Sequence, residues 1–310
     1  MHKNRQRRWI GFQDLALLVI MIGGYLFTIF VPRRWDLRWI EFAQKRLLSA
    51  RAHRIQNLAT LIRSTLPDIS EVESLRVAQE HYRLLLELWW GRFRSVGARG
   101  WRPEIEIEGR EHLDAALSKG RGAVLWRTRF TENSIFLQGL WRHEAGAVHL
   151  SNEGHGSPDR SRLGIRWSAR LYRRAEDPYI EERVLIPMDG SLGYVRRLLE
   201  KLGGNNAVSI VGENKGRQNI GGVVFGQPVA YASGAPALAW RSGAELLTAY
   251  TIRLATFRYR VVIDPPLYID RGLERKEFVK ESVAEFCKRL ERQVKSHPAD
   301  WLGWHGPRRG

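Results

Sequence analysis

A carboxylate, an amide and a guanidinium follow one short apolar run closely enough to form a binding site. Residues 207–211 are apolar apart from one serine, and Glu213, Asn214 and Arg217 come soon after them. Such a run predicts a buried strand of an open α/β sheet, where ligands bind at the carboxyl ends of the strands. The guanidinium of Arg217 is suited to hold a phosphate through two parallel hydrogen bonds. We therefore expect these three residues to bind the polar part of a substrate.

The residues after this loop predict the elements that hold it in position. Phe225, Gly226 and Pro228 form a short motif in which the glycine permits a tight path and the proline fixes the backbone that follows. Residues 233–244 begin with serine, are rich in small residues and contain a late glycine, which predicts a short capped helix. Residues 246–253 predict a second buried strand.

This order of motifs resembles the lysophospholipid acyltransferase superfamily and, within it, the bacterial lipid A lauroyl/myristoyl acyltransferases. Residues 234–244 match that family's Gly-x-x-x-Leu-Ala-x-x-x-Gly-Ala helix, and Glu213 stands at its acidic loop. Residues 101–113 are similar to the start of the family's catalytic domain, and residues 297–305 are similar to its closing segment. The likeness extends over residues 15–305.

The resemblance implies transfer of a fatty acyl chain from acyl carrier protein or acyl-CoA to a hydroxyl of a glycolipid or lysolipid. It also implies a place in lipid A biosynthesis at the bacterial inner (cytoplasmic) membrane, with an anionic membrane lipid or glycolipid as partner. No cofactor and no metal are expected. Six residues fall on the side of the family's site that handles the acceptor, the last three mainly shaping the backbone: Glu213, Asn214, Arg217, Phe225, Gly226 and Pro228.

One segment departs from the family pattern. Family members carry a His, four residues and then Asp or Glu on the loop after the first catalytic-domain strand. The matching segment of this chain follows the apolar residues 123–126, and it holds Arg129 at the His position and Ser134 at the acid position. None of the nine histidines is followed after four residues by Asp or Glu.

This departure matters because acyl transfer to a hydroxyl needs a base. A neutral imidazole suits that role near pH 7, and a carboxylate behind it fixes its tautomer. Arginine stays protonated, so Arg129 is expected to hold a phosphate or an oxyanion instead. We consider Arg129, Glu132, Ser134 and His149 as the catalytic candidates, with His149 as a replacement base at the end of the next strand. His155, in the loop after that strand, could reach the same edge.

Two functions from different classes stay open. The first is an acyltransferase with an altered catalytic loop. The second is a catalytically inactive homologue that keeps the fold and binds lipid or a partner enzyme. A histidine and a carboxylate within about 3.2 Å of each other beside the residue 129 loop would favour the first function.

Residues 15–31 form an unbroken apolar run, which Pro32 ends. At about 1.5 Å per helical residue, the run is near the lower limit for spanning a bilayer. No small-residue cleavage site follows it, so we expect an uncleaved membrane anchor. Basic residues stand on both sides, so the positive-inside rule gives no orientation, and a monotopic, tilted or re-entrant anchor is an alternative. They are Lys3, Arg5, Arg7 and Arg8 before the run, and Arg33, Arg34 and Arg38 after it.

The net charge of +17 requires an anionic partner or an arginine-rich solvated surface. Nucleic acid is not expected, because no recognised binding motif is present. Arginine alternates with tryptophan in residues 33–39, 89–94 and 99–102, which is typical of a surface at lipid headgroup depth. The alternative explanation is that these arginines simply belong to ordinary solvent-exposed faces. The single cysteine, Cys287, excludes an intramolecular disulfide and is expected to be a small apolar residue within a helix.

These patterns predict an α/β protein with a mixed, mainly parallel sheet sandwiched by helices. Residues 1–34 would form the basic flanks and the anchor helix, and residues 35–100 a helical hairpin that breaks near residue 67. Residues 101–310 would form the acyltransferase-like domain. Seven segments of this domain show strand patterns: 104–108, 123–126, 145–150, 184–187, 208–211, 246–253 and 259–263.

Overall fold

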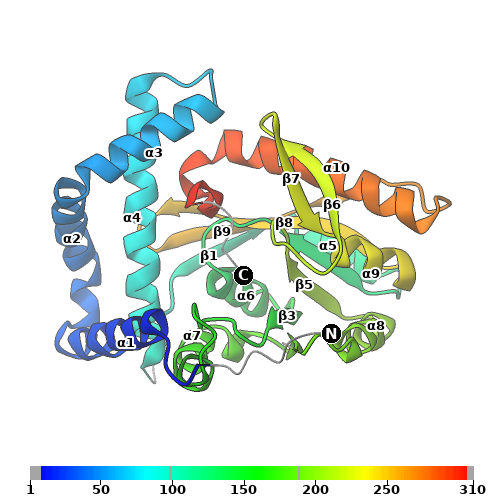
Figure 1. Cartoon of the computed structure of the whole chain (residues 1–310), viewed down its shortest axis with the longest axis horizontal. Coiled ribbons are helices and arrows are strands. Elements are labelled where there is room, and N and C mark those ends of the chain that lie inside the picture. Colours follow the sequence, from blue (N-terminus) through cyan, green and yellow to red (C-terminus); the bar gives the residue numbers. More distant parts are fainter. Residues whose placement is uncertain (1–7, 98–99, 188, 306–310) are drawn as a thin grey trace.

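The computed structural model describes residues 8–97, 100–187 and 189–305 (Figure 1). Lys3, Arg5 and Arg7, predicted to flank the membrane anchor, and Arg99, predicted to face lipid, lie outside the described residues.

Seven strands form one mixed, mostly parallel sheet. Every neighbouring pair runs parallel except β8 and β9. The α/β class and the mainly parallel sheet are therefore confirmed. The strands in spatial order are β1 (Glu104–Glu108), β9 (Arg258–Pro266), β8 (Glu245–Ala255), β2 (Ala123–Arg127), β5 (Ala207–Val211), β3 (Val148–Asn152) and β4 (Glu182–Ile186).

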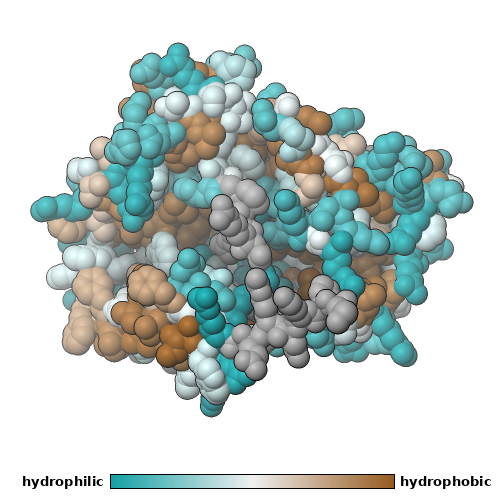
Figure 2. Space-filling model, viewed as in Figure 1, coloured by the Kyte–Doolittle hydropathy of each residue, from teal (hydrophilic) through white to brown (hydrophobic). Residues whose placement is uncertain are grey.

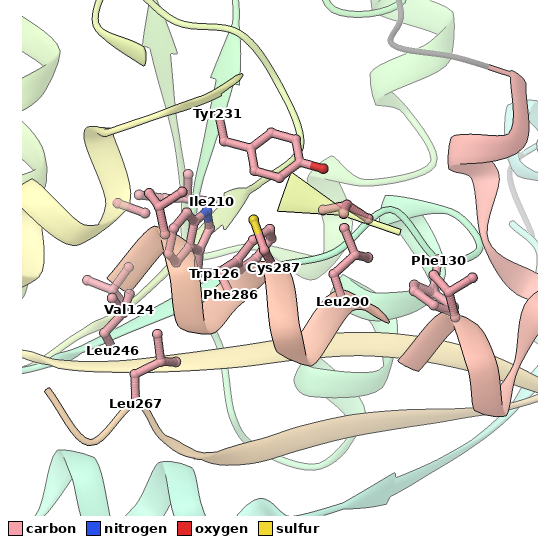
Figure 3. Packing of buried hydrophobic residues seen from close by; sticks show 14 of the residues in the cluster. Val124, Trp126, Phe130, Ile210, Tyr231, Leu246, Leu267, Phe286, Cys287 and Leu290 are labelled. Atoms are coloured by element: carbon pink, nitrogen blue, oxygen red, sulfur yellow. The ribbon is translucent and has the colours of Figure 1, made fainter. Parts of the chain in front are cut away.

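The strand β2 lies in the middle of the sheet and is buried along its whole length. Val124 and Trp126 belong to one hydrophobic cluster, whereas the alternate residues Ala123 and Leu125 belong to another. Trp126 stacks on Phe286 with 4.1 Å between the ring centroids (Figure 3). Five helices of the sheet domain contribute to these clusters: α5 (Arg110–Leu117), α6 (Asn133–Arg142), α8 (Gly193–Gly203), α9 (Gly234–Ser242) and α10 (Arg275–Ser296).

Four α-helices precede the sheet: α1 (Phe12–Phe30), α2 (Asp36–Ala50), α3 (Ala52–Thr65) and α4 (Glu71–Val96). A one-turn helix (Arg33–Trp35) joins α1 to α2. The Ser70 hydroxyl accepts a hydrogen bond from the Glu73 N–H at 3.1 Å and so caps the first turn of α4. Both α2 and α3 contact α4, and Arg51 divides what the sequence predicts as one helical segment.

A separate antiparallel hairpin, β6 (Asn219–Val224) and β7 (Gln227–Ala232), stands over α10 and was not predicted. Phe225 and Gly226 form its two-residue turn with φ values of 50° and 72°. Positive φ at both positions matches the twist of the flanking strands, and Gly226 adopts it without strain. The motif therefore shapes the backbone of the turn between β6 and β7. Cys287 is buried beneath β6, as expected of a small apolar residue.

The connection from β3 to β4 contains a π-helix (Gly164–Ser168), α7 (Ala169–Arg173) and a one-turn helix (Asp177–Tyr179). The sequence predicts a single amphipathic helix over residues 161–174. Since π-helical turns widen a helix and often accompany functional sites, this connection is relevant to the site described next.

Candidate active site

The loop between β2 and α6 is fastened by residues from the end of the chain. The Thr131 N–H donates to the Asp300 carbonyl at 3.1 Å, and the Leu302 N–H donates to the Arg129 carbonyl at 2.8 Å. Thr131 adopts a positive φ of 44°, which is strained for a β-branched residue. The loop that carries the altered motif is therefore held firmly in one conformation.

Glu213 supports the same loop from the end of β5. Its Oε1 accepts the Arg129 backbone N–H at 2.5 Å, and its Oε2 accepts the Trp301 indole N–H at 2.8 Å. Burial raises the pKa of the Glu213 carboxyl, and these two hydrogen bonds and the Arg129 charge oppose the rise. Both oxygens are thus engaged within the protein, so Glu213 braces the backbone of Arg129.

The Arg129 side chain is half-buried and lies within electrostatic range of His305. Burial lowers the pKa of His305, and the Arg129 charge lowers it further. His305 Nε2 lies 2.8 Å from His81 Nε2, and His81 Nδ1 lies 2.7 Å from the Ala299 carbonyl oxygen. A cation and a neutral imidazole therefore lie close together at the loop that follows β2.

Glu132 is committed to a buried ion pair. Its Oε1 accepts the Arg92 Nε–H at 2.5 Å and the Tyr172 hydroxyl at 2.9 Å, and Arg92 Nη2 also donates to that hydroxyl oxygen at 2.8 Å. The Arg92 and Glu132 side chains are only 13% and 7% exposed. A carboxylate held this way is a poor general base, because protonating it would leave Arg92 buried without a counter-charge.

Ser134 and His149 point into the protein. Ser134 is buried in the first turn of α6, and His149 is buried with its Nδ1 3.4 Å from the Ser209 hydroxyl oxygen. Burial first, and the Arg127 charge second, lower the pKa of His149 well below its usual value. Neither side chain is placed to meet a substrate in this conformation.

His155, in the loop after β3, pairs with a buried carboxylate. Its Nε2 lies 3.2 Å from Glu176 Oε1, and Arg183 Nη2 donates to the other oxygen of Glu176 at 2.8 Å. Burial alone would raise the pKa of Glu176, but His155 and Arg183 lower it well below its usual value. Glu176 is therefore an ionised, 1% exposed partner for the imidazole.

Tyr172 joins these two pairs into one group, which we call the His155 cluster: Arg92, Glu132, His155, Tyr172 and Glu176. The His155 and Tyr172 rings meet edge to face with centroids 5.0 Å apart, and the Arg92 guanidinium carbon lies 4.7 Å from the Tyr172 ring centroid. Beneath the cluster, burial lowers the pKa of Arg127 to about 10, so this arginine is still cationic at neutral pH. The cluster lies beside the loop of Arg129, beyond the carboxyl ends of β2 and β3.

The other residues predicted to bind the acceptor do not belong to the His155 cluster. Asn214 and Arg217 are exposed, and Arg217 Nη1 donates to the Gly190 carbonyl. Phe225 and Gly226 line a pocket of about 890 Å³ together with Arg253 and Asp300, and Pro228 is exposed on β7. The Phe225 and Trp301 rings are 6.4 Å apart at their centroids. The hairpin turn thus lies near Trp301, which donates a hydrogen bond to Glu213.

Three members of the cluster were missed by the sequence analysis: Arg92, Tyr172 and Glu176. Arg92 was assigned to a lipid-facing series, and that assignment is wrong because its charge is paired inside the protein. Trp90, Arg94 and Trp101 of the same series are also buried. One sequence signal could have pointed to this cluster: His155 stands between two glycines in a loop after a predicted strand.

Comparison with protein-family models and with curated proteins finds no match. Across residues 8–97, 100–187 and 189–305, no group of three or more His, Cys, Asp or Glu side chains is arranged to hold a metal ion.

Proposed function

We propose that the protein is a membrane-associated O-acyltransferase of the lysophospholipid acyltransferase type, in which His155 replaces the base missing at Arg129. It would move a fatty acyl chain from acyl carrier protein or acyl-CoA to a hydroxyl of an anionic glycolipid or lysolipid at the bacterial inner membrane. The observation that carries this proposal is the distance of 3.2 Å between His155 Nε2 and Glu176 Oε1, next to the loop of Arg129 and Glu132. The mostly parallel sheet is consistent with that family.

The tautomer of His155 follows from its partner. Ionised Glu176 accepts a hydrogen bond, so Nε2 carries the hydrogen and Nδ1 keeps its lone pair. Within the described residues, no hydrogen bond to Nδ1 of His155 is found. Nδ1 is then the atom that accepts the proton of the attacking hydroxyl.

The acceptor oxygen bonds to the thioester carbonyl carbon while its proton passes to His155 Nδ1, and the carbon–sulfur bond then breaks. The imidazolium returns the proton to the leaving thiolate. Glu176 stabilises the imidazolium in between, which is the role a carboxylate has behind a catalytic histidine.

Arginine side chains surround the site and suit anionic substrates. Arg92, Arg127 and Arg183 keep the cluster cationic, and the partly buried Arg129 belongs to the same loop as Glu132 of the cluster. Arg129 would hold the phosphate of the acceptor or the oxyanion that forms on the thioester carbonyl.

A specific observation favours the second candidate, an inactive homologue that binds lipid or a partner enzyme. Glu132, Ser134 and His149, which are the catalytic candidates other than Arg129, are all buried or paired within the protein. In that case the His155 cluster would serve only to join the loops after β2 and β3.

Acyl transfer by the full-length protein separates the two candidates. Protein in mixed micelles would be incubated with labelled acyl carrier protein or acyl-CoA and a bacterial lipid extract. We expect His155→Gln to lower kcat by roughly 10² to 10⁴-fold, since that is the usual contribution of a general base. His53→Gln, on the exposed surface of α3, is the matched control and should keep full activity.

Glu176→Gln tests the role of the carboxylate apart from folding. Without the carboxylate charge, the imidazolium that would form on His155 during transfer is less stable, so kcat should fall while the protein stays folded. Arg129→Ala should instead weaken acceptor recognition by about 2 to 3 kcal/mol. Full transfer by the folded His155→Gln protein would refute His155 as the base, and no transfer by the natural sequence with either donor would favour the inactive homologue.

A further inference from the structure

The helix α1 presents a long apolar face to the outside of the molecule. Phe12, Val19 and Leu26 stand seven residues apart and are 85%, 62% and 50% exposed. Figure 2 shows hydrophobic residues gathered over this helix, at the lower left of the view. By length and composition α1 is able to cross a membrane. The way it packs against the protein favours a different arrangement.

The opposite side of α1 is a narrow buried stripe. Asp14, Met21 and Thr28 are also seven residues apart, and each is buried. At about 100° per residue, this stripe lies roughly 200° around the helix from Phe12, Val19 and Leu26. One side of α1 therefore packs on the protein, while the other side is largely uncovered by the part of the chain that the structure describes.

The N-terminal end of α1 is fixed by the loop that follows β3. The buried Asp14 carboxylate accepts the Ser157 hydroxyl at 2.9 Å and both the N–H and the hydroxyl of Ser161, at 3.0 and 2.6 Å. Asp159 in turn accepts the Gln13 N–H at 2.6 Å. A buried carboxylate with this many donors is costly to remove from its site.

Glycines allow α1 to approach the body closely. A Cβ on Gly164 would lie 2.1 Å from the Asp14 carboxylate, and a Cβ on Gly24 would lie 2.5 Å from the Phe93 ring on α4. Neither distance is possible for a real side chain. By contrast, a Cβ on the neighbouring Gly23 would meet nothing within 4 Å, since it is turned outward.

The C-terminal end of α1 is held by Arg94 of α4. Its guanidinium donates to the carbonyls of Thr28 and Val31 at 2.6 and 2.8 Å and forms an ion pair with Asp36. These carbonyls belong to the last turn of the helix and the residue after it, where backbone acceptors lack partners within the helix. A cation at this position also complements the helix dipole.

The rest of the protein is thus attached to α1 at its beginning, middle and end. With 19 residues and a rise of about 1.5 Å per residue, α1 is about 28 Å long. If α1 crossed the bilayer, the body alongside it would have to lie at the same depth. Arg162, Arg166 and Arg170 are exposed on the segment that packs against α1, and charges in the hydrocarbon cost several kcal/mol each.

We infer that α1 lies in the plane of the membrane interface, with its outer face in one leaflet of an anionic bilayer and both its ends on the same side. The inference rests on the membrane association in the proposed function but not on acyl transfer. Charge complementarity supports the choice of partner, because exposed arginines stand at both ends of the apolar face. They are Arg8, Arg162 and Arg166 at one end and Arg33, Arg34 and Arg38 at the other.

Two of these arginines pair with exposed tryptophans. The Arg162 guanidinium carbon lies 4.4 Å from the Trp9 ring centroid, and that of Arg166 lies 5.7 Å from the Trp167 ring centroid. Trp9 and Trp167 are 72% and 48% exposed. Aromatic rings beside phosphate-binding cations are the composition expected at headgroup depth.

The depth of three spin labels tests this inference. Cysteines would replace Phe12, Val19 and Leu26 one at a time in the full-length protein, bound to vesicles of phosphatidylglycerol and phosphatidylethanolamine. Cys287 is buried and burial raises its thiol pKa to about 11, so it stays unlabelled. Oxygen and a water-soluble nickel complex would report the depth of each label.

An in-plane helix places all three labels at the same shallow depth, about 5 to 10 Å below the headgroups. A spanning helix places the middle label deepest and the outer two near opposite surfaces. Labels at clearly different depths would overturn the inference. Three labels that are fully exposed to the nickel complex would also overturn it. A label at Arg196 on α8 is the control for water exposure. Because transfer is not measured, the result is independent of the catalytic proposal.

Discussion

Glu213 and Glu176 are both buried carboxyl groups, yet their surroundings shift their pKa values in opposite directions. Burial dominates at Glu213, whose two hydrogen bonds come from neutral N–H donors of Arg129 and Trp301. At Glu176, an arginine and a histidine outweigh burial. A permanently ionised carboxylate suits the stabilisation of an imidazolium, which is why we place Glu176 rather than Glu213 behind the base.

Asp300 gives a prediction about pH. Burial raises its pKa to about 7, although the Arg253 N–H donates to its Oδ2 at 3.0 Å. The folded protein then binds a proton that the unfolded chain releases near pH 4, so the free energy of unfolding falls as pH rises from about 4 to 7. Asp300→Asn keeps an acceptor for Arg253 and removes the charge.

We expect the Asp300→Asn variant to lose this fall in stability, so that its melting temperature exceeds that of the natural protein at pH 8 more than at pH 5. Thermal unfolding in detergent at four pH values between 5 and 8 measures the difference. Asp189→Asn, at an exposed loop position, is the control. Parallel pH curves for the natural protein and the Asp300→Asn variant would contradict the assignment of this slope to Asp300.

The proximity of Arg129 and Glu213 could be predicted because position in a parallel sheet is partly readable from the sequence. Arg129 and Glu213 follow β2 and β5, which are parallel neighbours, so their contact could be anticipated from two strand ends. The pairing of His155 with Glu176 could not be predicted from the sequence, because it depends on the π-helical connection between the two residues. Arg92 was misplaced because an arginine within a helix shows no sign in the sequence of a distant buried carboxylate such as Glu132.

At the scale of elements, the strands that are continuous apolar runs were found and the irregular ones were not. The hairpin β6 and β7 contains Gly221, Gly222, Gly226 and Pro228, residues that disfavour strands in isolation. Pairing between its two strands overrides that preference. The break between α2 and α3 at Arg51 has no proline or glycine to signal it.

Gly164 offers an element-scale prediction, because the π-helix must approach α1 at this residue. Gly164→Ala forces a Cβ against the Asp14 carboxylate, so we expect the protein to lose about 1 to 3 kcal/mol of stability, as overpacked cores do. Gly23→Ala gains the same helix propensity without a clash and should be neutral or stabilising by up to about 1 kcal/mol.

Thermal unfolding of the two alanine variants in the same detergent compares them directly. Limited proteolysis between α1 and α2 adds a local measurement, since a loosened α1 should be cut faster in Gly164→Ala. Equal stability and equal cleavage of both variants would mean that α1 is not seated on the π-helix.

At the scale of the whole molecule, the net charge of +17 divides into an internal and an external part. Arg92, Arg94, Arg127 and Arg183 are largely buried and hold loops and helices together. The arginines around α1 remain exposed beside an apolar face. Other exposed basic residues, such as Arg196 and Lys276, lie on elements away from this apolar face.

This distribution predicts that position, and not charge alone, controls membrane binding. Replacing Arg34 and Arg38 together by glutamine should weaken binding to anionic vesicles by about 1 kcal/mol per residue, roughly 30-fold for both. The same charge change at Arg196 and Lys276, exposed on α8 and α10, should have little effect. Vesicle sedimentation at physiological ionic strength measures both pairs. Equal losses would show that only the net charge matters.

The loop after β3 carries His155 and, two and six residues later, the serines that donate hydrogen bonds to Asp14 of α1. If the protein transfers acyl chains as proposed, this arrangement would let it meet its lipid acceptor by lateral diffusion in two dimensions. The concentration that governs its rate is then the mole fraction of acceptor in the surface, not its bulk molarity. Diluting the acceptor with an inert lipid would slow turnover even when the total amount of acceptor in the tube is unchanged.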